Sequence, residues 1–190
     1  RAVSKEVGDK ILKIVDDMEL RAKSLGCDMR KGQPTPGNIE GGLSSIEEKS
    51  LGAIMKSGSK PIQGVLGYTE RVTDQKGLWI KDTPGREPEI LTGMAATGAQ
   101  VMMFSTGRGA PQGFPSMPVI KICGNPNTYQ RMEEDMDINA GRIITGEKTI
   151  EEVGEEAFAK LIRTLSGEMT KNEAIQYITS IDIQCLGPVI

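Results

Sequence analysis

The segment Gln100–Gly113, QVMMFSTGRGAPQG, decides the predicted fold. It begins with an unbroken apolar run, residues 101–104, which is typical of a short strand buried on both faces. The run ends in a turn where Arg108 lies between Gly107 and Gly109. Glycine permits a tight turn close to a ligand, and a guanidinium binds a carboxylate or phosphate through paired hydrogen bonds. Because ligands bind at the carboxyl ends of strands in open α/β sheets, the segment predicts an anion-binding loop.

Composition restricts the classes of protein that fit this chain. Its 190 residues suffice for one well-buried domain, with 37% hydrophobic and 26% charged residues. The net charge of −3 argues against a nucleic-acid partner, and no apolar run reaches the roughly 20 residues of a membrane span. Three widely spaced cysteines favour a reducing compartment, so we expect a cytoplasmic protein. No histidine is present, which excludes Ser-His-Asp and Cys-His catalysis and histidine-ligated zinc within this chain.

Polar, glycine-containing turns follow three predicted strands: residues 78–81, 101–104 and 119–123. A helix predicted over residues 87–97 connects the first two, which makes a βαβ unit with a parallel, right-handed crossover. We therefore predict an α/β fold, in which a Rossmann-like parallel or mixed sheet is flanked by helices. Parallel strands would bring Asp82, Arg108 and Asn125 to one edge.

Capping signals and apolar periodicity predict two long helices. Residues 4–25 form one, with Ser4 as its N-cap, and residues 149–165 form the other, with Thr149 and Glu152 as a capping box. We expect both to serve packing and assign no chemistry to the second. The shorter predicted elements are a strand over 61–66 and helices over 127–134 and 170–178.

Residues 26–44 are rich in proline and glycine, which fits a structured loop or a linker. A helix follows, with Ser45 as its N-cap and Glu48 three residues later. Two interpretations of its first turn stay open. Either Glu48 only caps the backbone N–H of Ser45, or the acids Glu47 and Glu48 face the preceding loop. In the second interpretation these acids ligate a metal or move a proton, and Lys49 holds a carboxylate.

Four motifs occur in a fixed order along the chain: QPTPGNIEGGLSSIEEKSLGA at Gln33–Ala53, DTPG at Asp82–Gly85, FSTGRGAPQGF at Phe104–Phe114 and DINAG at Asp137–Gly141. Together they resemble the altronate dehydratase/galactarate dehydratase family, with the related sulfolactate sulfo-lyase large subunits. The resemblance covers residues 24–172 and corresponds to the family's C-terminal part. It implies that residues 1–190 form a single α/β domain, which is a C-terminal, catalytic-region fragment of a longer enzyme. We expect the isolated fragment to be inactive.

The resemblance implies β-elimination from a hydroxy-acid. Either a sugar acid of the altronate or galactarate kind loses water to give a 2-keto-3-deoxy acid, or sulfolactate loses sulfite to give pyruvate. The family also implies a divalent metal, Fe²⁺ first, with Mn²⁺ or Mg²⁺ as alternatives. The residue chemistry is compatible, because a base must remove the proton next to a carboxylate and cations must hold the resulting dianion.

The motif matches and the predicted strand ends assign candidate site residues. The catalytic candidates are Glu48, Lys49 and Arg108, with Arg108 as a carboxylate clamp and Lys49 or Glu48 handling protons. Glu47 is the candidate metal ligand. The substrate-binding candidates are Asn38, Asp82, Thr106, Gly107, Gly109, Asn125 and Asn139.

The predicted partners are a small hydroxy-acid substrate and the remaining domains or subunit of the same enzyme, and an assembly of identical copies is compatible with the sequence. Two other classes stay open: a carboxylate-binding or assembly module without turnover, and a nucleotide-binding regulatory domain. The chain contains no P-loop and no dinucleotide-binding glycine motif in a strand–helix context, which disfavours the second class.

Overall fold

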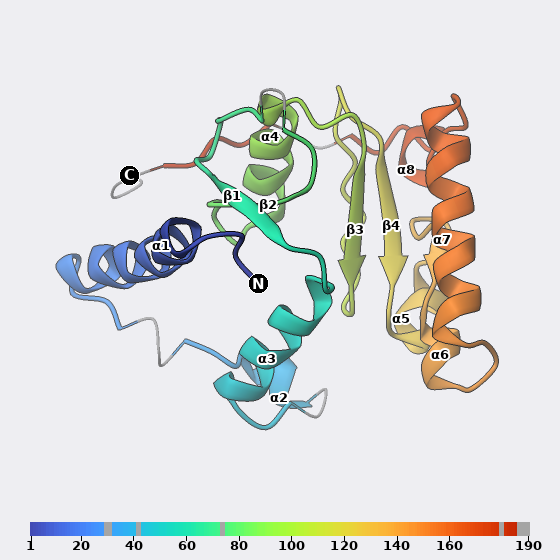
Figure 1. Ribbon diagram of the computed structural model, residues 1–190. Helices are drawn as coiled ribbons and strands as arrows, with labels where there is room; N and C mark the ends of the chain where they lie inside the picture. Colours follow the sequence, from blue (N-terminus) through green and yellow to red (C-terminus); the bar gives the residue numbers. More distant parts are fainter. Residues whose placement is uncertain (29–31, 41–42, 73–74, 179–180, 186–190) are drawn as a thin grey trace. The chain divides into compact units, whose positions relative to one another are not determined.

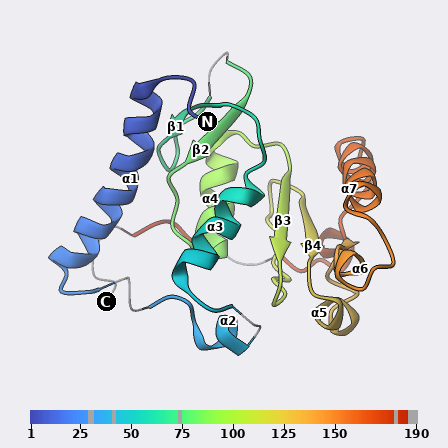
Figure 2. The same cartoon turned by 60° about the horizontal axis from the view of Figure 1, so that its bottom comes forward.

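The computed structural model describes residues 1–28, 32–40, 43–72, 75–178 and 181–185. The chain divides into two compact units (Figures 1 and 2). The first unit is Arg1–Gly67 with Thr73–Asp82, and the second is Tyr68–Val72 with Thr83–Ile190. None of the described helices combines the length and the hydropathy that a membrane span requires.

In its described part the first unit contains helices and one small parallel sheet: α1 (Lys5–Ser24), α2 (Pro36–Glu40), α3 (Ile46–Lys56), β1 (Ile62–Leu66) and β2 (Leu78–Lys81). Strands β1 and β2 pair in parallel. The N-terminal residues join this sheet, because the Val3 N–H donates to the Ile62 carbonyl and the Ile62 N–H donates to the Arg1 carbonyl. The described part of the segment 26–44 includes the short helix α2.

Side-chain caps start the helices of this unit at the predicted residues. The Ser4 hydroxyl accepts from the Val7 N–H, and the Ser45 hydroxyl accepts from the Glu48 N–H, so both N-caps are confirmed. The packing predicted for the apolar stripe of α1 is confirmed only in part. Val7 is its buried residue, whereas Val15 is 61% exposed and Met18 39% exposed. Periodicity marks which face is apolar, but it does not fix what covers that face.

The second unit is built on a parallel sheet with helices around it: α4 (Glu87–Thr97), β3 (Met102–Thr106), β4 (Val119–Cys123), α5 (Pro126–Arg131), β5 (Ile138–Asn139), α6 (Gly141–Ile144), α7 (Ile150–Leu165) and α8 (Lys171–Ala174). The strand order is β3-β4-β5, and every pairing in this sheet is parallel. The register aligns Thr106 with Cys123 and Cys123 with Asn139. The carboxyl ends of the three strands therefore meet at one edge.

Helices α4 and α7 lie on opposite sides of the β3–β4 pair, as Figure 1 shows. Leu91 of α4 packs with Phe114, Met117 and Val119 on one face. On the other face, Val153 of α7 packs with buried isoleucines of β4 and β5. This layering of helix, parallel sheet and helix confirms the predicted α/β fold class.

Two predictions about the strands are wrong. The predicted partner of residues 78–81 was the strand at 101–104, but β2 pairs with β1 in a separate sheet, and Asp82 follows that sheet. The strand buried on both faces is β4 and not β3, since Met103 is 38% exposed and Ser105 is exposed. The order β3-β4-β5 explains this difference, because the central strand is the one that both helical layers cover.

The two longest helices of the second unit lie where the sequence predicts them. The capping box of Thr149 and Glu152 is confirmed at the start of α7, and α4 spans the predicted residues 87–97. The helices predicted over 127–134 and 170–178 are shorter than expected, at α5 and α8. Along the stripe of α7, Val153 is buried, whereas Phe158 is 63% exposed. The part of the stripe at Val153 therefore packs against the sheet, whereas the part at Phe158 is exposed.

Two helical glycines provide a matched test of packing in the second unit. A Cβ on Gly141 would lie 2.5 Å from the backbone nitrogen of Pro126, whereas a Cβ on Gly154 in α7 would meet nothing within 4 Å. We expect Gly141→Ala to lower the free energy of unfolding of the chain by about 1–3 kcal/mol through overpacking. Gly154→Ala should raise it by about 0.5–1 kcal/mol, because alanine favours a helix interior. Urea unfolding of both variants measures the difference, and equal effects would contradict the tight contact at Gly141.

Candidate functional site

Two of the quoted motifs and the turn after β4 meet at the carboxyl edge of the sheet β3-β4-β5. The Arg108 turn follows β3, Asn125 follows β4, and Asn139 ends β5. Backbone hydrogen bonds fix the edge: the Gly124 N–H donates to the Thr106 carbonyl at 2.9 Å, and the Ala140 N–H donates to the Cys123 carbonyl at 2.8 Å. This edge is the usual ligand-binding side of an open α/β sheet.

The Arg108 turn has an ordered backbone and a free guanidinium. The Gly109 N–H donates to the Thr106 hydroxyl at 3.1 Å, and the Thr128 hydroxyl donates to the Gly107 carbonyl at 2.9 Å. Gly109 has a φ of +88°, and a Cβ there would lie 2.2 Å from the Met132 sulfur. Arg108 itself is exposed and has no hydrogen bond or ion pair with any described residue. The turn therefore presents a cation that is available to an anionic ligand.

The side-chain amide oxygens of the two asparagines at this edge accept hydrogen bonds from nearby backbone N–H groups. Asn125 Oδ1 accepts from the N–H groups of Asn127 and Thr128 and so caps α5. Asn139 Oδ1 accepts from the Gly141 N–H at 3.0 Å. Each Nδ2 group remains as a donor that makes no hydrogen bond with the described residues. Their role in substrate binding stays a prediction.

In the first unit, the loop and the helix that carry the longest motif are in contact. The Lys49 ammonium donates to Asn38 Oδ1 at 3.0 Å and also to the side-chain oxygen of Gln33. Asn38 Oδ1 in addition accepts from the Thr35 N–H. The structure thus brings together two of the predicted residues, Asn38 and Lys49.

Glu48 caps the start of α3, but at a different residue from the predicted one. Its carboxylate accepts from the backbone N–H of Ser44 at 2.8 Å and from the Ser44 hydroxyl, so the predicted cap on the Ser45 N–H is wrong. The hydrogen bond from the Ser44 hydroxyl, followed by the backbone one, lowers the pKa of Glu48. Both favour the charged form, and the carboxylate is therefore ionised near neutral pH.

Glu47 is exposed in the first turn of α3. Across the described ranges, no three Cys, Asp or Glu side chains are arranged to hold a metal ion. The described residues therefore do not form a complete metal site by themselves.

Asp82 lies at the end of β2 and is exposed. Its N–H donates to the Leu66 carbonyl at the end of β1, at 2.8 Å. The predicted site residues accordingly fall into two groups. The first unit carries Asn38, Glu47, Glu48, Lys49 and Asp82, and the second carries Thr106, Gly107, Arg108, Gly109, Asn125 and Asn139.

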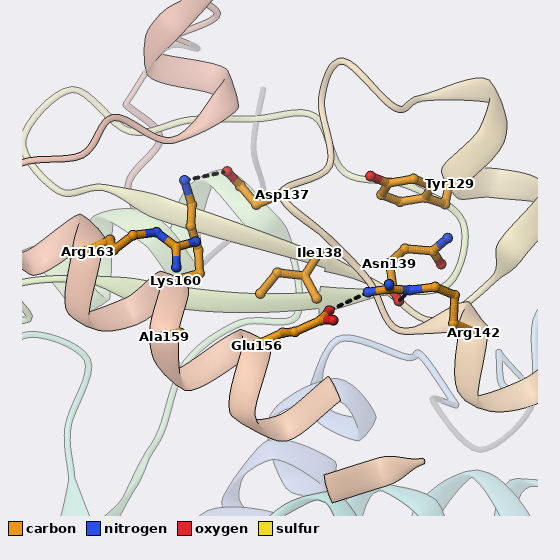
Figure 3. A pocket seen from close by; sticks show the side chains of 9 residues that line it. All are labelled: Tyr129, Asp137, Ile138, Asn139, Arg142, Glu156, Ala159, Lys160 and Arg163. Carbon is orange, nitrogen blue, oxygen red and sulfur yellow. Dashed lines mark hydrogen bonds and ion pairs between the residues drawn. The ribbon is translucent and has the colours of Figure 1, made fainter. Parts of the chain in front are cut away.

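A cleft of about 410 Å³ opens beside β5 and α7 in the second unit (Figure 3). Its charged side chains are paired: Arg142 bonds to Glu156, and Lys160 lies 3.5 Å from Asp137. The hydrogen bond from Lys148 is the main cause of a lowered pKa at Glu156, with Arg142 adding to it. The sequence analysis missed this cleft, although charged residues at the helical spacing of 156, 160 and 163 mark one side of α7. The paired charges make it a weaker anion site than the Arg108 turn.

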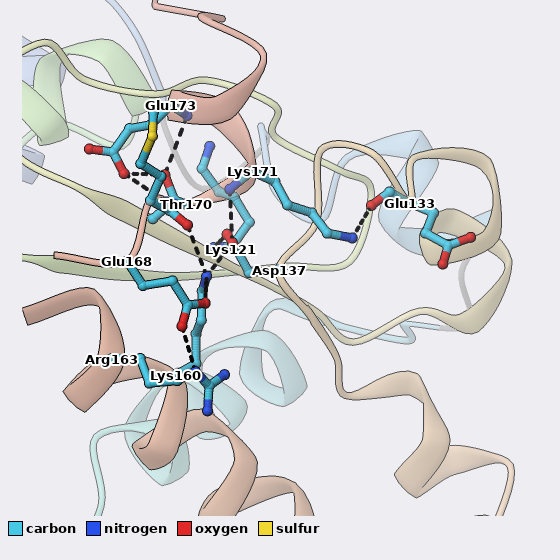
Figure 4. Close-up of polar contacts among 10 residues, drawn as sticks. Lys121, Glu133, Asp137, Lys160, Arg163, Glu168, Thr170, Lys171 and Glu173 are labelled. Atoms are coloured by element: carbon cyan, nitrogen blue, oxygen red, sulfur yellow. Dashed lines mark hydrogen bonds and ion pairs between the residues drawn. The ribbon is translucent and has the colours of Figure 1, made fainter. Parts of the chain in front are cut away.

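Lys121 is a second residue that the sequence analysis missed. It lies in the middle of β4 with 1% exposure, and its Nζ donates to the carbonyls of Ala110, at 2.6 Å, and Gln112. Burial lowers its pKa to about 8, against the opposing charge of Asp137. Figure 4 shows this region, where the Asp137 carboxylate accepts from the Lys121 N–H. The available signal was a lysine inside an otherwise apolar strand, VIKIC.

These features describe an α/β domain with a glycine–arginine turn and an INAG turn at the carboxyl edge of a parallel sheet. A family model described as "D-galactarate/Altronate dehydratase, C-terminal" matches residues 1–185. The chain therefore belongs to the D-galactarate/altronate dehydratase family and represents its C-terminal part, as the sequence resemblance predicted.

Several curated proteins are similar to this chain. It is 41% identical to the (2R)-sulfolactate sulfo-lyase subunit beta of Chromohalobacter salexigens over 78% of the chain and 38% of the relative. It is 41% identical to the galactarate dehydratase (L-threo-forming) of Escherichia coli over 88% of the chain and 32% of the relative. It is 34% identical to the altronate dehydratase of Bacillus subtilis over 91% of the chain and 34% of the relative. The chain thus spans about a third of the length of these relatives.

The lowered pKa of Lys121 predicts a pH-dependent stability. An unfolded lysine keeps its proton up to about pH 10.5, whereas the folded group loses it near 8. Between these values the unfolded state binds more protons, so the free energy of unfolding should rise with pH. Lys121→Met should remove this rise, as measured by urea unfolding of the chain at about pH 7.5, 8.5 and 9.5. Identical pH dependence in both proteins would contradict a buried, titrating Lys121.

Proposed function

We propose that this chain is the C-terminal part of a hydro-lyase that dehydrates a sugar acid of the altronate or galactarate kind to a 2-keto-3-deoxy acid. The observation that carries the proposal is the family match over residues 1–185, with galactarate and altronate dehydratases among the relatives. The free Arg108 guanidinium on an ordered turn supports it, because such a substrate carries a carboxylate.

The reaction requires the removal of a weakly acidic proton next to the substrate carboxylate. A base takes this proton, the C–H electrons form a C=C bond, and the neighbouring hydroxyl departs with a proton as water. The resulting enol then becomes the 2-keto acid. Negative charge grows on the carboxylate during proton removal, so donors aimed at its oxygens stabilise the transition state.

Arg108 is the proposed donor to this carboxylate. Its guanidinium offers two parallel N–H groups, and the Gly107 N–H makes no hydrogen bond with a described residue. The Gly109 N–H already donates to Thr106. Thr106 and Gly109 would thus act by ordering the turn, and Arg108 and Gly107 by contacting the substrate.

Lys49 and Glu48 are the proposed proton-handling residues. The lowered pKa keeps the Glu48 carboxylate ionised, and it also makes this carboxylate a weaker base than an unperturbed glutamate. Contact with Asn38 holds the Lys49 ammonium in place. Asp82, Asn125 and Asn139 would contact substrate hydroxyls.

We also propose that the complete enzyme uses a divalent metal, Fe²⁺ first, with Mn²⁺ or Mg²⁺ as alternatives. Such an ion supplies positive charge for the carboxylate and the leaving group. Glu47 would contribute one ligand. The remaining ligands would come from other domains or a subunit of the enzyme, since the described residues form no complete set.

The elimination of sulfite from sulfolactate is the second candidate function. The sulfo-lyase subunit and the galactarate dehydratase are equally similar to this chain, at 41% identity each. Both reactions begin with the same proton removal, and they differ in the leaving group. A panel of aldonates, aldarates and sulfolactate, offered to the full-length enzyme with and without ferrous ion, distinguishes them by release of a 2-keto acid alone or together with sulfite. No turnover of any member under either condition would favour a non-catalytic, carboxylate-binding module.

Replacing Arg108 tests the clamp. Arg108→Ala removes a charge-assisted, paired hydrogen bond to the substrate. This change should raise the KM of the full-length enzyme about 10–100-fold. Arg131→Ala is the matched control, because Arg131 is also exposed and makes no hydrogen bond or ion pair with the described residues. Steady-state kinetics with the best substrate of the panel measure both variants. Unchanged kinetics of Arg108→Ala would refute the clamp.

A further inference from the structure

The turn that carries Arg108 continues into an irregular segment, residues 107–113, whose backbone is held by side chains from three elements. Four carbonyls of this segment accept such hydrogen bonds. Thr128 of α5 donates to Gly107, Lys121 of β4 donates to Ala110 and Gln112, and Asn172 of α8 donates to Pro111. Irregular backbone has no ladder partners, so its polar groups depend on donors of this kind.

Lys121 is the least expected of these donors. A lysine is almost never fully buried, and burial of its charge is unfavourable unless hydrogen bonds compensate. Here the Nζ group lies 5.8 Å from the centre of the Phe104 ring and donates to two carbonyls of the segment. An apolar side chain would suit the core of β4 better. The lysine is explained by the segment that it holds.

Thr128 and Asn172 act at neighbouring points of the same segment. The Thr128 hydroxyl holds the carbonyl directly before Arg108, at 2.9 Å. Asn172 is fully buried, and the Gly113 N–H next to it donates to the Tyr177 carbonyl at 3.3 Å. The Arg108 guanidinium is left free while the backbone on both sides is fixed. A binding group that is already ordered before the ligand arrives loses less entropy on binding.

We propose that Lys121, Thr128 and Asn172 are positioning residues, which hold residues 107–113 so that Arg108 is aimed at the substrate carboxylate. This inference rests on the clamp role of Arg108 under the proposed function. None of the three touches the reacting atoms, and each acts through the backbone of the segment.

The test uses the full-length enzyme and two readouts. Thr128→Val removes one donor with almost no change in shape, and Thr164→Val is its matched control, because the buried Thr164 hydroxyl has no hydrogen-bond partner among the described residues. Lys121→Met removes two donors from within the core. Hydrogen exchange of residues 107–113 in the substrate-free enzyme reports on the segment, and KM and kcat report on the substrate.

We expect Thr128→Val to speed exchange in the segment about fivefold, and Lys121→Met to speed it more. KM should rise about five- to tenfold in Thr128→Val with a smaller change in kcat, and Thr164→Val should change neither readout. If Lys121→Met fails to fold, Thr128→Val decides the matter alone.

Unchanged exchange in Thr128→Val would overturn the proposal. Faster exchange with unchanged KM, while Arg108→Ala raises KM, would also overturn it and leave the proposed function in place. An unchanged KM in Arg108→Ala would instead refute the clamp itself, and the positioning role would fall with it. The two failures are therefore distinguishable.

Discussion

The buried carboxylate of Asp137 connects more elements of the second unit than its place directly before the two-residue strand β5 suggests. It is fully buried, accepts from the N–H groups of Lys121 and Lys171, and lies 3.5 Å from the Lys160 ammonium. One side chain thus links β4, α7 and α8 to the strand β5. A buried carboxylate is stable only with such partners, so the arrangement of these elements depends on the hydrogen bonds and the ion pair that Asp137 makes.

The same elements support the edge where the candidate site lies. Lys121, in the centre of β4, carries a charge opposite to that of Asp137. Its ammonium extends to the segment that follows Arg108. Local contacts complete the edge, since Asn125 caps α5 and Asn139 accepts from the Gly141 N–H. Gly141 in turn fits against the backbone of Pro126, which explains the glycine of the INAG motif by packing. Much of the motif chemistry at this edge therefore serves to fix backbone geometry, while the Arg108 guanidinium makes no hydrogen bond or ion pair with the described residues.

The chain spans about a third of the length of its relatives. Its candidate site residues lie in two separate units. Each unit carries a cationic candidate residue: Lys49, which contacts Asn38, and Arg108 on its ordered turn. Elimination next to a carboxylate requires a base, a leaving-group acid and cations, and these groups rarely come from one loop.

The sequence determined the features that depend on neighbouring residues. Ser4, Ser45 and Thr149 start their helices, because a side-chain cap reaches only three residues along the chain. The strands at 78–81 and 119–123 and the Arg108 turn were likewise predictable from apolar runs and glycines. The tertiary structure decided the pairing of β2 with β1, the burial of β4 in place of β3, and the contacts of Lys121 with residues 107–113. These depend on segments far apart in the sequence. The lysine in VIKIC indicates a buried charge, but strand pairing and the partners of that charge are set by the whole packed unit.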